Sequence, residues 1–177
     1  MKLVLSFDIG IKNMAACLMD MDTKNILKWD LIDISSDKKN DLNDMSKNLI
    51  NAMDELVISD IDSNNPLLVL IENQPVMKAP TMKSIQMILY TYFQVLAVHE
   101  SRDITITLVS AMKKNSFMKS KGYDVKSKNY KSNKENSMKY VEEYLRSNND
   151  TTHLEILRSF KKKDDMCDAL IQILCIL

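Results

Sequence analysis

The first twenty residues constrain the fold more than any other part of the chain. Residues 3–9 and 14–20 are apolar and β-prone, and the stretch between them contains Gly10, one of only two glycines in the sequence. This pattern predicts two buried strands joined by a tight turn. Asp8 lies within the first apolar run, where an unpaired carboxylate is costly to remove from water. Asp8 therefore needs a partner group, a cation or a raised pKa.

The remaining periodicity predicts an α/β domain with the element order βββαβαβαα. Strands are expected at residues 3–9, 14–20, 26–34, 67–71 and 104–109, and helices at 41–59, 80–99, 134–147 and 164–177. The three N-terminal strands favour an antiparallel meander, and the wholly apolar run 67–71 is typical of a central strand. The lysine-rich segment that precedes residue 134 is too polar for close packing. With 177 residues, of which 45% are hydrophobic, the chain is most simply a single domain, residues 1–177.

The charge of the chain is unevenly distributed, although its formal net charge is zero. Residues 113–136 contain eight lysines and only two acids, so this segment carries +6 and the remainder −6. A polyanionic partner is therefore compatible with the neutral total. We expect no membrane contact and no secretory signal, because no apolar run approaches the ~18–20 residues of a membrane span. Three cysteines without Cys-x-x-Cys spacing favour a reducing compartment, the cytoplasm.

Three further acids stand at positions where they can meet Asp8. Glu72 follows the strand 67–71, at the carboxyl end where α/β sheets place ligands. Asp165 and Asp168 are three residues apart, so a helix places them on one face. Taken singly, these acids also fit the ordinary interpretations of a polar strand end and of a helix N-terminus. Clustered carboxylates repel one another unless cations lie among them, and hard oxygen ligands favour Mg²⁺ or Mn²⁺. Two such ions can promote phosphodiester hydrolysis.

The segments "SFDIGIKNMA", "LIENQP" and "KKDDMCDALIQ", in this order, resemble the RuvC-type Holliday junction resolvases, and most of all the poxvirus enzymes. The likeness runs from residue 3 to about 174. It implies a ribonuclease H-like fold, with a five-stranded mixed sheet (an antiparallel meander plus two parallel strands) flanked by helices. It also implies a Mg²⁺-dependent homodimer, in which Mn²⁺ can substitute for Mg²⁺. The activity implied is symmetric cleavage of four-way DNA junctions to 5′-phosphate and 3′-hydroxyl ends, in viral recombination and concatemer processing in the host-cell cytoplasm.

The resemblance also assigns roles to residues. It implies metal ligation by Asp8, Glu72, Asp165 and Asp168, with Asp164 as an alternative to Asp165. A catalytic lysine after the fifth strand falls on Lys114, with Lys113 and Lys134 as the other candidates. We further expect Lys12, Asn13, Lys113, Lys131 and Lys134 to contact DNA, since lysines bind phosphates without sequence specificity. Phe117, Tyr123 and Tyr130 are interleaved with the lysines and could stack on unpaired bases.

The helix at about 80–99 is apolar on more than one side, which suits packing against both the sheet and a partner copy. A helix buried within one monomer is the other interpretation. Three further functions stay open. "DIGIKN" also resembles the phosphate loop of actin-like kinases, but the chain lacks their length and glycines. A ribonuclease H-like nuclease could act on another branched or hybrid nucleic acid. A non-catalytic junction-binding protein is disfavoured, because four acids would repel DNA.

Overall fold

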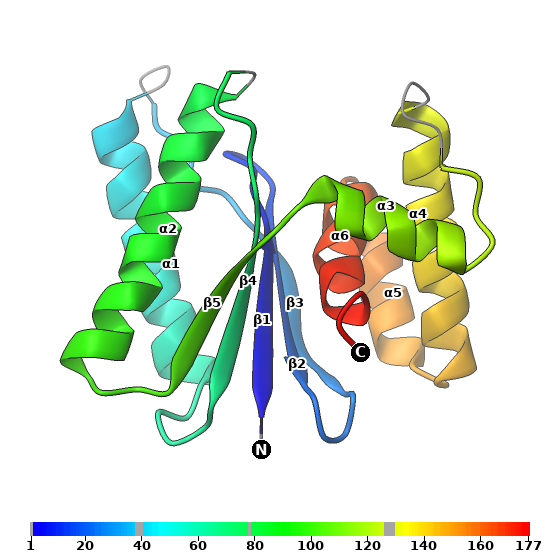
Figure 1. Cartoon of the computed structure of the whole chain (residues 1–177), viewed down its shortest axis with the longest axis horizontal. Helices are drawn as coiled ribbons and strands as arrows, with labels where there is room; N and C mark the ends of the chain where they lie inside the picture. Colours follow the sequence, from blue (N-terminus) through cyan, green and yellow to red (C-terminus); the bar gives the residue numbers. More distant parts are fainter. Residues whose placement is uncertain (1, 38–40, 78, 126–129) are drawn as a thin grey trace.

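The computed structural model describes residues 2–37, 41–77, 79–125 and 130–177. Within these ranges the chain forms five strands and six helices (Figure 1). Their bounds are β1 Leu3–Asp8, β2 Met14–Asp20, β3 Ile26–Ile32, α1 Leu42–Asp60, β4 Leu67–Glu72, α2 Pro80–His99, β5 Ile104–Val109, α3 Ala111–Ser120, α4 Tyr130–Ser147, α5 Thr151–Ser159 and α6 Lys163–Leu174.

The five strands form one mixed sheet in the order β3-β2-β1-β4-β5. The pairs β1–β2 and β2–β3 are antiparallel, whereas β1–β4 and β4–β5 are parallel. The predicted meander with two added parallel strands is therefore confirmed. The turn between β1 and β2 is as tight as the glycine indicated, because a Cβ built on Gly10 would lie 2.6 Å from the Asn13 carbonyl oxygen. Any side chain at position 10 would force this turn to open.

Helices cover both faces of the sheet (Figure 1). On one face α1 and α2 bury Leu3, Leu5 and Phe7 of β1. On the other face, a second core joins Val4 and Trp29 to helices α4, α5 and α6. Alternate residues of β1 thus enter different cores, as the period of a strand requires. Because β1 is the middle strand, its carboxyl end with Asp8 lies between the two helical layers.

The sequence analysis was wrong about the segment after β5 and missed one helix. Residues 111–120 form α3 rather than an unpacked polar stretch, because Met118 is buried in the core and Phe117 packs beside it. The 9-residue α5 was not predicted, although Asp150 caps it by accepting from the His153 amide. Residues 126–129 of the lysine-rich segment lie outside the described residues. Among the helices that the structure describes, none has the length and apolar character needed to cross a membrane.

Candidate active site

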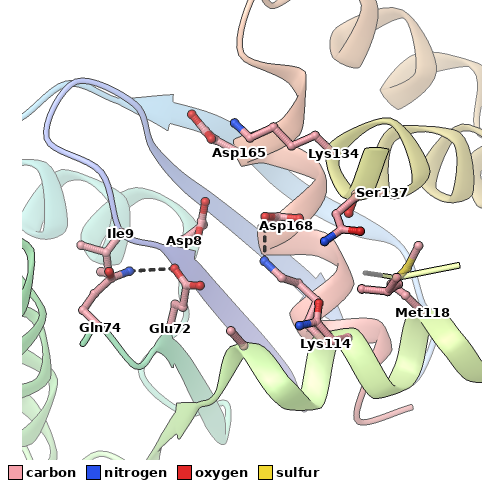
Figure 2. Close-up of a pocket in the computed structure, with 14 residues that line it drawn as sticks. Asp8, Ile9, Glu72, Gln74, Lys114, Met118, Lys134, Ser137, Asp165 and Asp168 are labelled. Carbon is pink, nitrogen blue, oxygen red and sulfur yellow. Dashed lines mark hydrogen bonds and ion pairs between the residues drawn. The ribbon is translucent and has the colours of Figure 1, made fainter. Parts of the chain in front are cut away.

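A pocket of about 380 Å³ opens where β1 and β4 end, and side chains from α3, α4 and α6 complete its wall (Figure 2). Six of the lining residues are ones that the sequence singled out, namely Asp8, Glu72, Lys114, Lys134, Asp165 and Asp168. The fold therefore brings together acids that are distant along the chain. The structure places these side chains, and their chemical roles stay predictions.

Asp8 and Glu72 are neighbours because their strands are parallel and in register. Phe7 pairs with Ile71, so the next residue of each strand emerges at the same edge of the sheet (Figure 2). Burial raises the pKa of Asp8 well above its ordinary value, and the charge of Glu72 and a hydrogen bond to it raise it further. Asp8 therefore keeps its proton to a higher pH than an ordinary aspartate does. Gln74 Nε2 donates to Glu72 Oε2 at 2.7 Å and orients that carboxylate.

The helix that carries the other two acids is anchored to the sheet at two points. The indole Nε1 of Trp29 on β3 donates to the Met166 carbonyl oxygen at 3.0 Å. Gln172 Nε2 donates to the Phe7 carbonyl oxygen at 3.2 Å, directly before Asp8. The apolar residues of this helix are buried against the sheet, among them Met166, Ala169, Leu170 and Ile173. The position of the acids of α6 relative to Asp8 therefore depends on apolar side-chain packing and two side-chain hydrogen bonds rather than on a strand ladder.

Asp168 faces a lysine across the pocket. Lys114 Nζ, from α3, lies 2.6 Å from Asp168 Oδ2 (Figure 2). Burial raises the pKa of Asp168, although Lys114 and a hydrogen bond from Ser137 oppose the rise. Burial disfavours the ammonium form of Lys114, yet the charges of Asp168, Asp8 and Glu72 outweigh it and raise the pKa of Lys114. Lys114 is thus held as a cation among three acids.

The second lysine of the pocket pairs with a different acid. Lys134, from α4, forms an ion pair with Asp164, which does not line the pocket, whereas Asp165 does. Burial alone would raise the pKa of Asp164, but the hydrogen bond and charge of Lys134 lower it. Burial and the nearby charge of Asp164 raise the pKa of Asp165 to about 6. Lys114, rather than Lys134, therefore lies nearest the acids that converge on Asp8.

The other residues expected to contact DNA lie outside this pocket. Lys12, Lys113 and Lys131 are exposed, and Asn13 is half-buried in the turn that follows Gly10. The rings of Phe117 and Tyr123 pack edge to face against Tyr140, and Tyr123 Oη donates to Glu143 Oε2 at 2.6 Å. Base stacking by these two rings would require them to leave that contact. The side chain of Tyr130 lies outside what the structure describes.

Sequence reasoning missed the residues that hold the acids in place, which are Gln74, Ser137, Trp29 and Gln172. Gln74 stands two residues beyond Glu72, within the motif already singled out, but its partner could not be deduced from spacing. Ser137, Trp29 and Gln172 occur in ordinary helix and strand patterns. A buried amide at position 172, in an otherwise apolar helix face, was the one available signal.

The donor chemistry of the pocket fits a hard divalent cation. Its acidic wall offers carboxylate oxygens, which Mg²⁺ and Mn²⁺ prefer. Among the described residues, no three His, Cys, Asp or Glu side chains are grouped closely enough to hold a metal ion as they stand. In this arrangement Lys114 supplies the positive charge.

Three solved structures have a similar fold. The yeast mitochondrial Holliday junction resolvase Ydc2 matches with a TM-score of 0.63 and 18% identity, over 97% of this chain and 77% of that one. The RuvC structure of Thermus thermophilus matches with a TM-score of 0.63 and 13% identity, over 98% of this chain and 92% of that one. RuvC of T. thermophilus in complex with Holliday junction substrate matches with a TM-score of 0.50 and 11% identity, over 69% of this chain and 73% of that one. These likenesses show a RuvC-type, ribonuclease H-like fold.

Comparison of sequences gives the family. The uncharacterized protein L451 of Acanthamoeba polyphaga mimivirus is 37% identical in a 114-residue alignment that covers 59% of this chain. The chain covers only 27% of that relative's length. The model of the family described as Poxvirus A22 protein matches residues 2–176, almost the whole chain. This chain therefore belongs to the Poxvirus A22 protein family.

Proposed function

We propose that this chain is a metal-dependent endodeoxyribonuclease that resolves four-way DNA junctions. The observation that carries the proposal is the convergence of Asp8, Glu72 and Asp168 around Lys114, in a pocket that Asp165 also lines. The same fold occurs in Ydc2, which is described as a Holliday junction resolvase, and in RuvC, which is described in complex with Holliday junction substrate. Viral DNA recombination and the processing of concatemers are the processes that such an activity would serve.

The four acids would hold Mg²⁺, and Mn²⁺ could replace it. When bound, the metal supplies positive charge beside the scissile phosphate and eases deprotonation of the attacking water. The carboxylates of the strands and of α6 approach from opposite sides of the pocket, so they fix where the phosphate can lie. Lys114 stays protonated, because the surrounding acids raise its pKa, and it can stabilise charge on the phosphate. Water adds to phosphorus, the P–O3′ bond breaks and a proton ends on O3′, which leaves 5′-phosphate and 3′-hydroxyl ends.

Binding of the junction would use the exposed lysines around the pocket. Lys113 lies next to Lys114 at the start of α3, Lys131 begins α4, and Lys12 follows the turn at Gly10. Lysines at these places would contact backbone phosphates and give salt-dependent affinity. Lys134 is also close to the pocket, but its ion pair with Asp164 must loosen before it can bind a phosphate.

Symmetric cleavage needs two active sites, and α2 offers a surface for a second copy. An apolar pocket of about 440 Å³ lies between α1 and α2, lined by Ile50, Met87, Ile88, Thr91, Tyr92 and Val95. Val95 is 48% exposed and Met87 43%. The predicted homodimer would bury these side chains. Sedimentation of the wild type and of Val95→Asp tests this: the wild type should sediment as a dimer and the variant as a monomer.

Cleavage of a synthetic mobile four-way junction tests the proposal most directly. Linear duplex, flap and RNA–DNA hybrid substrates should be run beside it, with Mg²⁺ and with chelator. Paired nicks restricted to the junction and abolished by chelator are expected. Equal cutting of the hybrid would favour a ribonuclease H-like enzyme with another substrate, and binding without any cutting would favour a non-catalytic junction-binding protein.

A further inference from the structure

Glu72 is oriented through the chain segment that follows β4. Asn73 continues the sheet, because its amide donates to the Val109 carbonyl oxygen at 2.8 Å. The next residue, Gln74, turns its side chain back, and its Nε2 donates to Glu72 Oε2 at 2.7 Å (Figure 2). The orientation of the Glu72 carboxylate therefore depends on where Gln74 is held.

Gln74 is held by a residue of α2. The Gln74 amide donates to Gln86 Oε1 at 2.8 Å. Lys83 Nζ donates to the same oxygen at 3.2 Å and to Asn73 Oδ1 at 3.0 Å. Lys83 thus ties both residues that follow Glu72 to one turn of α2. This network joins α2, which lines the apolar pocket between α1 and α2, to Glu72 in the acidic pocket.

Gln86 is fully buried, on the face of α2 that packs against the sheet. Its buried neighbours on this helix, Ile85, Leu89 and Phe93, are apolar. An apolar side chain of similar size would pack there without the cost of desolvating an amide. The described hydrogen bond of Gln86 Nε2 goes to a weak acceptor, Met87 Sδ, at 3.9 Å. The strong interactions of Gln86 are therefore those of its oxygen, and they are directed at the segment behind Glu72.

We propose that Gln86 is a positioning residue, which acts through Gln74 to fix the Glu72 carboxylate for its role in the pocket. This inference rests on the proposed nuclease function. A carboxylate that loses such an outer partner samples more orientations, and changes of this kind cost about 10- to 100-fold in metal affinity or activity. The position of Glu72 on β4 would be unchanged, because the strand ladder sets it.

Three variants separate positioning from packing. Gln86→Met keeps the length and buried apolar stem of the side chain but removes the acceptor. Gln86→Glu keeps an acceptor oxygen for the Gln74 amide and for Lys83. Gln74→Ala removes the direct donor to Glu72 from a loop residue, so it tests the same path if Gln86→Met fails to fold. Ser84→Ala is the matched control on α2, because Ser84 Oγ donates only to the Pro80 carbonyl oxygen at 3.2 Å within its own helix.

Each variant should be measured in three ways: single-turnover cleavage of the four-way junction, junction affinity with chelator, and the rise in melting temperature on adding Mn²⁺ alone. Gln86→Met and Gln74→Ala should lower the cleavage rate about 10-fold or more and reduce the Mn²⁺-induced rise. Their junction affinity should stay within twofold of the wild type. Gln86→Glu should recover most of the rate, and the double variant should be no worse than the more damaging single one, because both act on one path.

The outcomes distinguish this inference from the proposed function. If the wild type cuts but Gln86→Met and Gln74→Ala match Ser84→Ala in rate and in Mn²⁺ response, Gln86 has no positioning role. If Gln86→Glu is as slow as Gln86→Met, the loss comes from packing and the inference is again wrong. If the wild type does not cut any junction, the proposed function fails. The Mn²⁺ response then still decides whether the path through Gln74 orients Glu72.

Discussion

The two sides of the pocket are built by different kinds of structure. On the sheet side, Asp8 and Glu72 are fixed by backbone hydrogen bonds, since Phe7 and Ile71 are paired in the ladder. On the helix side, Asp165 and Asp168 belong to α6, whose described hydrogen bonds to the sheet are donated by Trp29 and Gln172. The sheet side therefore has one arrangement, whereas the helix side can shift if a few side-chain contacts change. The two lysines that line the pocket, Lys114 and Lys134, form their ion pairs with acids of α6.

The largest effect is expected from breaking the sheet side. Asp8→Asn should lower junction cleavage by more than about 100-fold, because it removes the most central of the four proposed metal ligands. This loss exceeds the 10- to 100-fold that is typical when a residue that orients a ligand is removed. Junction binding with chelator should be retained. The pKa of Asp8 is raised in the folded protein. Ionisation of Asp8 therefore lowers the stability of the fold as the pH rises above the ordinary pKa of an aspartate, 3.8. The metal-free variant should therefore melt higher than the wild type at neutral pH. Normal cutting by Asp8→Asn would remove this aspartate from the mechanism.

A smaller effect should follow from removing the cation between the two sides. Lys114→Met should slow cleavage by about 100-fold, the loss typical of one preorganised donor. It should also raise the pKa of Asp168, because Lys114 is the group that opposes the effect of burial. Lys139→Met is the control, since Lys139 is an exposed lysine of α4 with only a 4.0 Å contact to Glu143. Equal rates for the two variants would place the required positive charge elsewhere.

Loosening the helix side should affect stability more than chemistry. Trp29→Phe removes the hydrogen bond to the Met166 carbonyl oxygen and part of the buried ring, at a cost of about 1–3 kcal/mol. Urea unfolding gives this difference directly. Single-turnover cleavage should fall only a few-fold, because the acids of α6 shift without being lost. A rate loss as large as that of Asp8→Asn would mean that cleavage requires the acids of α6 to be held as precisely as Asp8.

The smallest expected effect is a pH dependence of the helix side. The pKa of Asp165 is raised from 3.8 to about 6, so its contribution to stability is complete below pH 3.8 and is lost as pH rises through about 6. The melting temperature of metal-free Asp165→Asn should therefore fall less between pH 4 and about 6.5 than that of the wild type. The depressed pKa of Asp164 acts in the opposite direction, so the comparison is made between variants. Parallel curves for the two proteins would contradict the raised pKa.

The same contrast explains what could be predicted from the sequence. Asp8 was identified because it lies within an apolar run, and Glu72 because it follows one. Both patterns are local in the chain. The spacing of Asp165 and Asp168 also gave their shared helix face. The bounds of α6 differ from the expected 164–177 by only a few residues, because its apolar period is strong.

The remainder depends on contacts that no local pattern encodes. The helix α3 was missed because its ten residues are mostly polar, and it is held by Met118, one side chain in the core. Which lysine approaches Asp168 is decided by how α3 crosses the end of β5, and not by the spacing of Lys113 and Lys114. The partners Gln74 and Gln86 are twelve residues apart and meet only because α2 packs against β4.

The hydrogen bonds that anchor α6 have a consequence for the order of events during protein synthesis. They join Gln172 to Phe7 and Met166 to Trp29, pairs that are 165 and 137 positions apart. A growing polypeptide on the ribosome thus carries Asp8 and Glu72 long before the residues that complete the pocket have been made. The pocket assembles only when the last helix docks, so shortened translation products that lack this helix would also lack Asp165 and Asp168.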